Sequence, residues 1–341
     1  MRKETKLILF IFLVLVLTIL FNISLGSVSI PFREIISIIF SGESYQETWT
    51  YIVLEYRLPK AITSIMVGSG LGVSGLLMQT FFRNPLAGPY VLGLSSGAGL
   101  GVALLLMGSS LLGLGFSNSL WFSKTALILA SSIGSILVMS AILITSVKIK
   151  DSMALLIIGL MFASLTGAIV NVLSYFSTSD ELQQFVFWSL GSLGDLSWIE
   201  VSILAVFWSL GLLICLFLIK PLDALLIGES YAKSLGVNIK SLRYLTVIAT
   251  CILTGSITAF AGPIAFVGLA IPHLVRLILK TNKHIVMIPA VCLAGALVML
   301  VCDSISQLPG SDLTLPINAV TSFLGAPVVI WLILKSRQLN F

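Results

Sequence analysis

The sequence predicts an all-α, polytopic membrane protein with about ten transmembrane helices and both termini in the cytoplasm. Of the 341 residues, 57% are hydrophobic and only 10% are charged, and the mean hydropathy is +1.10. About a quarter of the residues in an ordinary soluble domain are charged, so this composition excludes a water-soluble enzyme. The abundance of aliphatic residues also excludes a disordered chain.

Nine stretches without a charged residue are long enough to cross a bilayer, which takes about 20 residues. They are 7–32, 61–82, 84–123, 125–147, 152–179, 201–219, 244–275, 284–302 and 313–334. The first follows basic residues as in a signal peptide, but it is longer than a signal core and we expect a retained span. Within the third, Gly108–Gly115 and Ser117–Ser119 predict an exit loop after one span.

The stretch 244–275 is predicted to form two spans, because Gly262–Pro263 interrupts it and proline removes a helix hydrogen bond. The distribution of basic residues supports this division. With ten spans and a cytoplasmic N-terminus, fifteen of the nineteen Lys and Arg residues lie in the cytoplasm, whereas nine spans leave only ten there. Because cytoplasmic loops carry an excess of Lys and Arg, ten spans are favoured.

Catalytic and metal-binding patterns are absent from the sequence. It contains no G-x-x-x-x-G-K-[ST] phosphate loop, no H-E-x-x-H and no ligand-spaced cysteines, so we expect no metal and no cofactor. The net charge of +5 is interpreted as a bias of basic residues to one side of the bilayer, so we expect no nucleic-acid partner. Two alternatives to an ATP-driven transporter stay open. A secondary carrier or channel is disfavoured because acidic residues are missing near the midplane, and a membrane-embedded enzyme because no catalytic constellation is present.

The segment 221–240 is too polar to span the membrane, yet it carries an apolar stripe. The stripe consists of Leu222, Leu225, Leu226, Tyr231, Leu235 and Val237. Gly228 and Gly236 predict breaks that leave short helices around them. An apolar stripe on a cytoplasmic segment needs something to cover it, either a partner protein or the ends of this chain's own helices.

The residues from Ser74 to Ala98 read SGLLMQTFFRNPLAGPYVLGLSSGA. They predict a span that ends near Phe82, a basic turn at Asn84-Pro85, and then a new Gly/Ser-rich span. This stretch, with Gln79 and Gly97, resembles the permease subunits of ABC importers for iron–siderophore, haem and cobalamin (the FecCD-type, type II importers).

Further motifs of the same family follow in order from about residue 55 to the C-terminus. They are Arg57-Leu58-Pro59-Lys60, Trp188–Leu193, Leu222–Val237, Gly262-Pro263-Ile264-Ala265-Phe266-Val267-Gly268-Leu269, Pro272-His273 with Arg276, Asp303, Leu315-Pro316 and Gly325-Ala326-Pro327. Their order and number make the resemblance specific, whereas one such motif alone is weak evidence.

The resemblance implies a single permease domain over residues 1–341 in a bacterial or archaeal cytoplasmic (inner) membrane. A second copy of this chain or a paralogue would complete the pathway. Two separate ATPase subunits would bind the ATP, which this chain does not bind, and an extracytoplasmic binding protein would dock on the outer face. The resemblance assigns docking to Arg57 and Lys60. It assigns ATPase coupling to Gly228, Glu229, Ala232, Leu235 and Gly236.

The resemblance also places the fifth span, Met153 to Phe176, beside the pathway, where Ser164, Thr166 and Asn171 are the polar candidates. Helix packing is the alternative role for such side chains. For His273 we expect a structural hydrogen-bonding role rather than metal binding.

Three positions depart from the family pattern, Gln307, Thr314 and Asn318, and all belong to the outer C-terminal region. The substrate is expected to be a metal chelate, with an iron–siderophore complex the most frequent case.

Overall fold

The computed structural model describes residues 3–41, 46–108, 124–148, 152–307 and 313–336, and it forms two compact units. Every regular element in these ranges is helical. The predicted exit loop after Gly108 lies outside the described residues. The predicted class, an all-α chain rich in apolar helices, is therefore confirmed for the described part.

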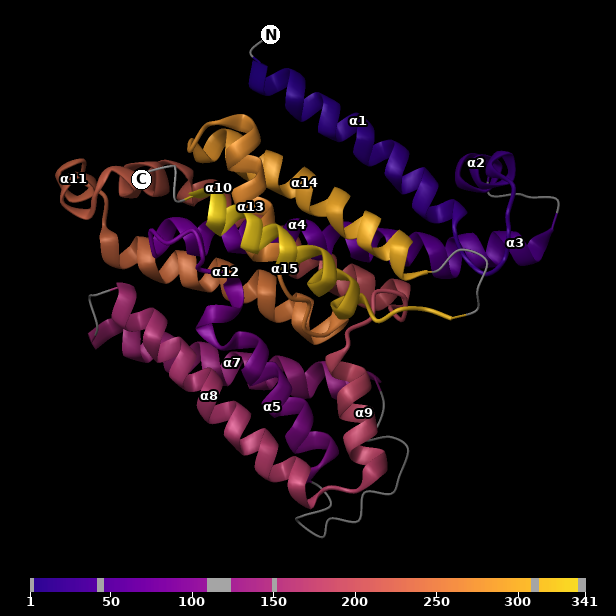
Figure 1. The fold of residues 1–341 in the computed structure, drawn as a ribbon, viewed down its shortest axis with the longest axis horizontal. Coiled ribbons are helices and arrows are strands. Elements are labelled where there is room, and N and C mark those ends of the chain that lie inside the picture. The colour runs from indigo at the N-terminus through magenta and orange to yellow at the C-terminus, as the bar shows by residue number, and fades with distance from the viewer. Residues whose placement is uncertain (1–2, 42–45, 109–123, 149–151, 308–312, 337–341) are drawn as a thin grey trace. The chain divides into compact units, whose positions relative to one another are not determined.

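Unit 1 comprises residues 1–73, 192–206 and 264–341 (Figure 1). Its elements are α1 (Lys3–Ser24), α2 (Phe32–Ser41), α3 (Glu47–Tyr51), the π-helical η1 (Ile52–Arg57), the first part of α4 (Leu58–Phe81), the start of α10 (Trp198–Ile227), α13 (Val267–Leu279), α14 (His284–Ser306) and α15 (Ile317–Ser336). Helix α1 packs along α14, and α14 also contacts α13 and α15. A core that includes Ile23, Ile35, Val53 and Leu300 lies among α1, α2, η1, α4 and α14.

Unit 2 comprises residues 74–191 and 207–263. Its elements are the end of α4, η2 (Pro89–Leu92), α5 (Leu94–Leu106), α7 (Lys124–Lys148), α8 (Ser152–Phe176), α9 (Ser179–Ser189), the rest of α10, α11 (Glu229–Ser234) and α12 (Ile239–Ala261). Helix α5 packs against α7, α8 and α12, and its core includes Val102, Leu106 and Leu173.

Seven of the helices in the described ranges are long and apolar enough to cross a membrane. They are Glu4–Ser24, Glu47–Phe81, Lys124–Thr145, Ala154–Phe176, Trp198–Ile227, Ile239–Ala261 and His284–Ser306. Three shorter apolar helices are α5, α13 and the segment Ile317–Trp331. The predicted break at Gly262–Pro263 is present, since α12 ends at Ala261 and α13 begins at Val267.

Small residues let helices approach closely inside each unit. In unit 1, a Cβ added to Gly68 of α4 would overlap the backbone carbonyl of Gly295 on α14. In unit 2, a Cβ on Gly101 of α5 would overlap the carbonyl of Ala130 on α7. Both glycines thus serve close packing between neighbouring helices.

Candidate functional site

A buried polar cluster joins three helices at one end of unit 1. Lys60 Nζ on α4 lies 3.0 Å from Asp303 Oδ1 on α14. The other carboxylate oxygen, Oδ2, accepts hydrogen bonds from Asn22 Nδ2 of α1 at 2.9 Å and from Gln307 Nε2 at 2.8 Å. Asp303 is 1% exposed, so the charge of this carboxylate is compensated by one cation and two amide donors. We call these four residues the Asp303 cluster.

Arg57, one turn before Lys60, holds the C-terminal end of α1. Its guanidinium donates hydrogen bonds to the carbonyl oxygens of Ile23 at 2.9 Å and Ser24 at 3.1 Å, and to that of Val28. The last carbonyls of a helix have no partner within the helix, and a cation there is favourable. Arg57 is 9% exposed and the Lys60 side chain 22%. Both predicted docking cations therefore have partners within the chain, and their docking role stays a prediction.

The positions that depart from the family pattern have contacts of their own. Gln307 belongs to the Asp303 cluster, and Asn318 Oδ1 accepts a hydrogen bond from the backbone N–H of Ala265 at 3.1 Å, beside the start of α13. Thr314 is exposed. Asn22 was missed by the sequence analysis, although an amide inside an otherwise apolar span is a signal that it has a polar partner.

The basic turn after α4 is held by local hydrogen bonds in unit 2. Asn84 Oδ1 accepts from the N–H of Leu86 at 2.9 Å, which is an Asx turn, and the Asn84 N–H donates to the Gln79 carbonyl at 3.1 Å. Pro85 lies within this turn, and Gln79 itself is buried. Gly97, further along, lies on α5 where an added Cβ would press on Gly134 and Val138 of α7.

Two motifs that are far apart in the sequence meet at the end of unit 2. A Cβ added to Gly262 would lie 2.8 Å from Gly191 Cα and 2.9 Å from the Trp188 carbonyl oxygen, and the φ angle of Gly262 is +76°. Glycine is required here by both the backbone conformation and the space. The Gly262–Pro263 break thus packs directly against the segment 188–191.

Helix α13 of unit 1 carries the rest of the Pro-His motif. Pro272 is buried in the helix interior, and His273 and Arg276 are half-buried and one turn apart. No group of three His, Cys, Asp or Glu residues that could hold a metal ion occurs within the described ranges. The structural hydrogen-bonding role of His273 stays a prediction.

The pathway candidates all lie on α8 but do not share one face. Ser164 and Asn171 are exposed and two turns apart, which places them on the same side of the helix. Thr166 is buried, and its hydroxyl donates to the carbonyls of Phe162 and Ala163. The Ser164 hydroxyl donates to the Leu160 carbonyl at 3.0 Å. Both hydroxyls bond their own helix, and lining of a pathway stays a prediction for all three residues.

The predicted coupling segment differs in helix boundaries from the expectation. Residues 221–227 continue α10 through Pro221, rather than forming a separate short helix. Proline inside a membrane helix is tolerated where its surroundings satisfy the freed carbonyl. The break comes at Gly228, whose φ of +146° favours glycine.

Helix α11 ends in a Schellman turn around Gly236. The N–H of Val237 donates to the Ala232 carbonyl and that of Gly236 to the Lys233 carbonyl, each at 3.0 Å, and the φ of Gly236 is +83°. Ala232 is fully buried, and Glu229 Oε2 lies 3.9 Å from Lys233 Nζ on the surface. Gly228 and Gly236 thus set the two ends of α11, and Ala232 packs its buried side.

The apolar stripe of this segment divides into two parts. Leu222 and Leu225 are buried within the chain, so this part of the stripe is covered by the chain's own helices. Of the other stripe residues, Leu226, Tyr231 and Leu235 remain exposed, with Leu235 the most exposed at 59%, and Val237 is half-buried. Ile227, which is beside the stripe, is also exposed. We call these four exposed residues the coupling patch.

The sequence profile of the FecCD transport family matches residues 14–335. The chain belongs to the FecCD transport family. It is 34% identical to the hemin transport system permease protein HmuU of Yersinia pestis, over 99% of this chain and 98% of that protein. It is also 34% identical to the vitamin B12 import system permease protein BtuC of Klebsiella pneumoniae, over 98% of this chain and 96% of that protein.

Solved structures share the fold of this FecCD chain. One, described as an inward-facing metal-chelate type ABC transporter, superposes with a TM-score of 0.83 at 30% identity and covers 97% of this chain and 99% of its own. PsaBC from Streptococcus pneumoniae, at 17% identity and a TM-score of 0.55, covers 89% of this chain and 95% of its own, and shows likeness of fold alone. The FecCD chain is a multi-pass membrane permease subunit and not an enzyme.

Proposed function

We propose that this chain is the membrane-spanning subunit of an ATP-driven importer of a metal chelate. The observation that carries the proposal is the exposed coupling patch in a chain whose sequence has no phosphate loop. Energy must then enter from a partner, and an exposed apolar surface beside a rigid turn is suited to binding one. Two ATPase subunits at this surface would bind the ATP, while this chain binds no cofactor.

The substrate class follows from the relatives. Their names refer to hemin and vitamin B12, and the similar solved structure is described as a metal-chelate type transporter. Hemin and vitamin B12 are both metal chelates, so a metal chelate is the substrate class that we propose. An iron–siderophore complex remains our expectation within that class, delivered by an extracytoplasmic binding protein.

The proposed transport cycle is alternating access through a pathway made by two permease chains, either two copies or this chain and a paralogue. Ten spans and cytoplasmic termini are proposed for each chain, in the inner membrane of a bacterium. The seven long apolar helices and the three shorter ones support this number. The distribution of basic residues supports the orientation.

Reconstitution tests the proposal. The permease is placed in vesicles with its ATPase and binding protein, and uptake is measured for labelled ferric siderophores, haem and cobalamin. We expect accumulation of one of these chelates only with ATP and with all three components. Uptake driven by an ion gradient without the ATPase would instead identify a secondary carrier.

A further inference from the structure

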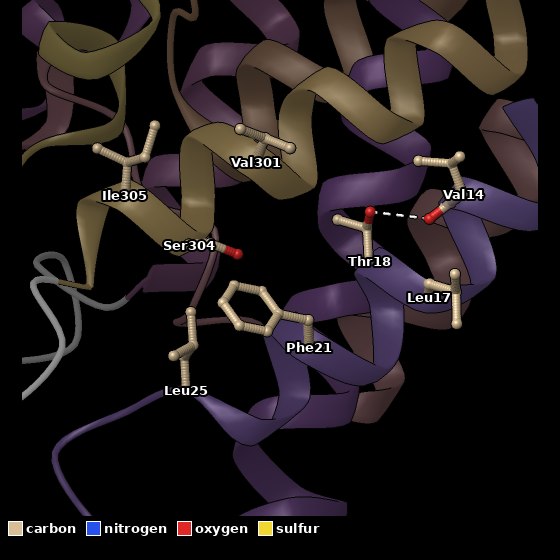
Figure 2. A pocket seen from close by; sticks show the side chains of 8 residues that line it. All are labelled: Val14, Leu17, Thr18, Phe21, Leu25, Val301, Ser304 and Ile305. Carbon is tan, nitrogen blue, oxygen red and sulfur yellow. Dashed lines mark hydrogen bonds between the residues drawn. The ribbon is translucent and has the colours of Figure 1, made fainter.

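An apolar groove of about 670 Å³ lies between α1 and α14 in unit 1 (Figure 2). One wall is a single face of α1, formed by Val14, Leu17, Thr18 and Phe21, together with Leu25 just after the helix end. The other is formed by α14 within 301–305. Figure 2 shows the Phe21 ring lying between the two helices, toward Ser304.

The two hydroxyl groups in the groove already have partners. Thr18 Oγ1 donates to the Val14 carbonyl oxygen at 2.8 Å, the bond drawn in Figure 2. Ser304 Oγ donates to the Leu300 carbonyl at 2.9 Å and accepts from Asn22 Nδ2 at 3.0 Å. Every other lining side chain is a hydrocarbon. A groove with such walls favours an apolar ligand over water.

The position and length of the groove fit one leaflet of a bilayer. Both walls belong to candidate membrane spans, and the groove continues the exposed apolar surface of α1. From Val14 to Leu25, a helix rises about 16 Å, which is about half of a hydrocarbon core of about 30 Å. At the Leu25 end, α1 stops at Ser24 and α14 stops at Ser306, as expected near the membrane surface.

We propose that this groove binds one acyl chain of a membrane phospholipid. The chain enters at the Leu25 end and reaches the midplane near Val14. Its inner contact is Ser304, which is hydrogen-bonded to Asn22 and thereby adjoins the Asp303 cluster. The inference requires only that α1 and α14 lie in the membrane, so it is independent of the substrate and of transport.

The test compares two matched tryptophan variants. Leu17 and Leu9 on α1 are 59% and 58% exposed, but only Leu17 lines the groove. The full transporter is extracted in mild detergent, and retained phospholipid is counted by native mass spectrometry. We expect one retained phospholipid per permease chain in the wild type and in Leu9→Trp, and a severalfold loss in Leu17→Trp. A second variant from the opposite wall, Val301→Trp, should show the same loss.

Thermal unfolding separates loss of lipid from loss of fold. Added phospholipid should raise the unfolding temperature of the delipidated wild type and of Leu9→Trp, and leave Leu17→Trp unchanged. Equal retention in both tryptophan variants, or no retained lipid in the wild type, would overturn the proposal. So would a map of the whole complex in which a helix of another protein chain fills the groove.

Discussion

Lys60 Nζ lies 3.0 Å from Asp303 Oδ1, and this ion pair ties α4 to α14 across 243 residues of sequence with the carboxylate 1% exposed. Breaking such a pair by removing one partner leaves a buried charge without compensation. The pair therefore contributes to stability mainly because its loss would leave the buried Asp303 carboxyl without a partner cation.

The first prediction concerns that ion pair. Lys60→Met should destabilise the protein by about 3 kcal/mol, because the buried Asp303 carboxyl loses its cationic partner. Lys60→Met combined with Asp303→Asn should recover most of the loss, since a neutral amide can still accept from Asn22 or Gln307. Thermal unfolding in detergent measures both, and equal unfolding temperatures for wild type and Lys60→Met would contradict the stabilising role.

The second prediction concerns docking, and Lys60 is the better probe than Arg57. A carboxylate in place of Arg57 would face the carbonyls of Ile23 and Ser24, so Arg57→Glu should impair folding. Lys60→Gln keeps a donor for Asp303 but removes the charge, so its unfolding temperature is measured beside the association rate to separate weaker docking from a weakened ion pair. If Lys60 meets an acidic residue of the binding protein, association at low salt should slow severalfold. Arg33→Gln, an exposed cation of α2, is the control.

The third prediction contrasts two helical glycines. Gly68→Ala should destabilise by about 1–3 kcal/mol, because its Cβ would overlap the Gly295 carbonyl and push α4 from α14. Gly167→Ala on α8 meets no atom within 4 Å and should be neutral or stabilising by up to about 1 kcal/mol. Chemical unfolding of the two purified variants measures the difference. A similar loss of stability in both variants would show that the close contact between α4 and α14 does not depend on Gly68.

The fourth prediction concerns the coupling patch. Leu235→Asp places a charge on an exposed side chain, so the chain should still insert, while ATPase co-purification and ATP-driven uptake should both fall sharply. Ser230→Asp puts the same charge on the exposed surface of α11 and should bind the ATPase normally. Normal ATPase binding by Leu235→Asp would exclude the patch as the docking surface. Ala232→Arg is less informative, since Ala232 is fully buried and its replacement would disturb α11 itself.

The fifth prediction concerns topology. A reporter that is active only in the cytoplasm should be active when it is fused after Lys283, because ten spans place the segment between α13 and α14 inside. The positive charges Arg276, Lys280 and Lys283 favour this side. Activity of an exported reporter at the same position would mean that α12 and α13 together cross the membrane once.

Much of the fold was predictable because in a membrane each segment must satisfy its own backbone hydrogen bonds. Charge-free stretches therefore predict helices almost one by one, and the Gly262–Pro263 break was confirmed on the same reasoning. Helix boundaries were less predictable. The sequence suggested a loop from Pro221, but α10 continues to Ile227, because neighbouring segments can compensate for a proline in ways that local sequence does not reveal.

The sequence by itself determined the membrane class, the order of the apolar helices, the family motifs and the absence of a nucleotide-binding loop, all of which depend on composition or on residues close together along the chain. Only the tertiary structure decided which polar side chains are engaged. Arg57 and Lys60 carry the same charge three residues apart, yet one holds the end of α1 and the other pairs with Asp303. Asn22 and Asp303 are separated by 281 residues, so their contact exists only because α1 packs along α14.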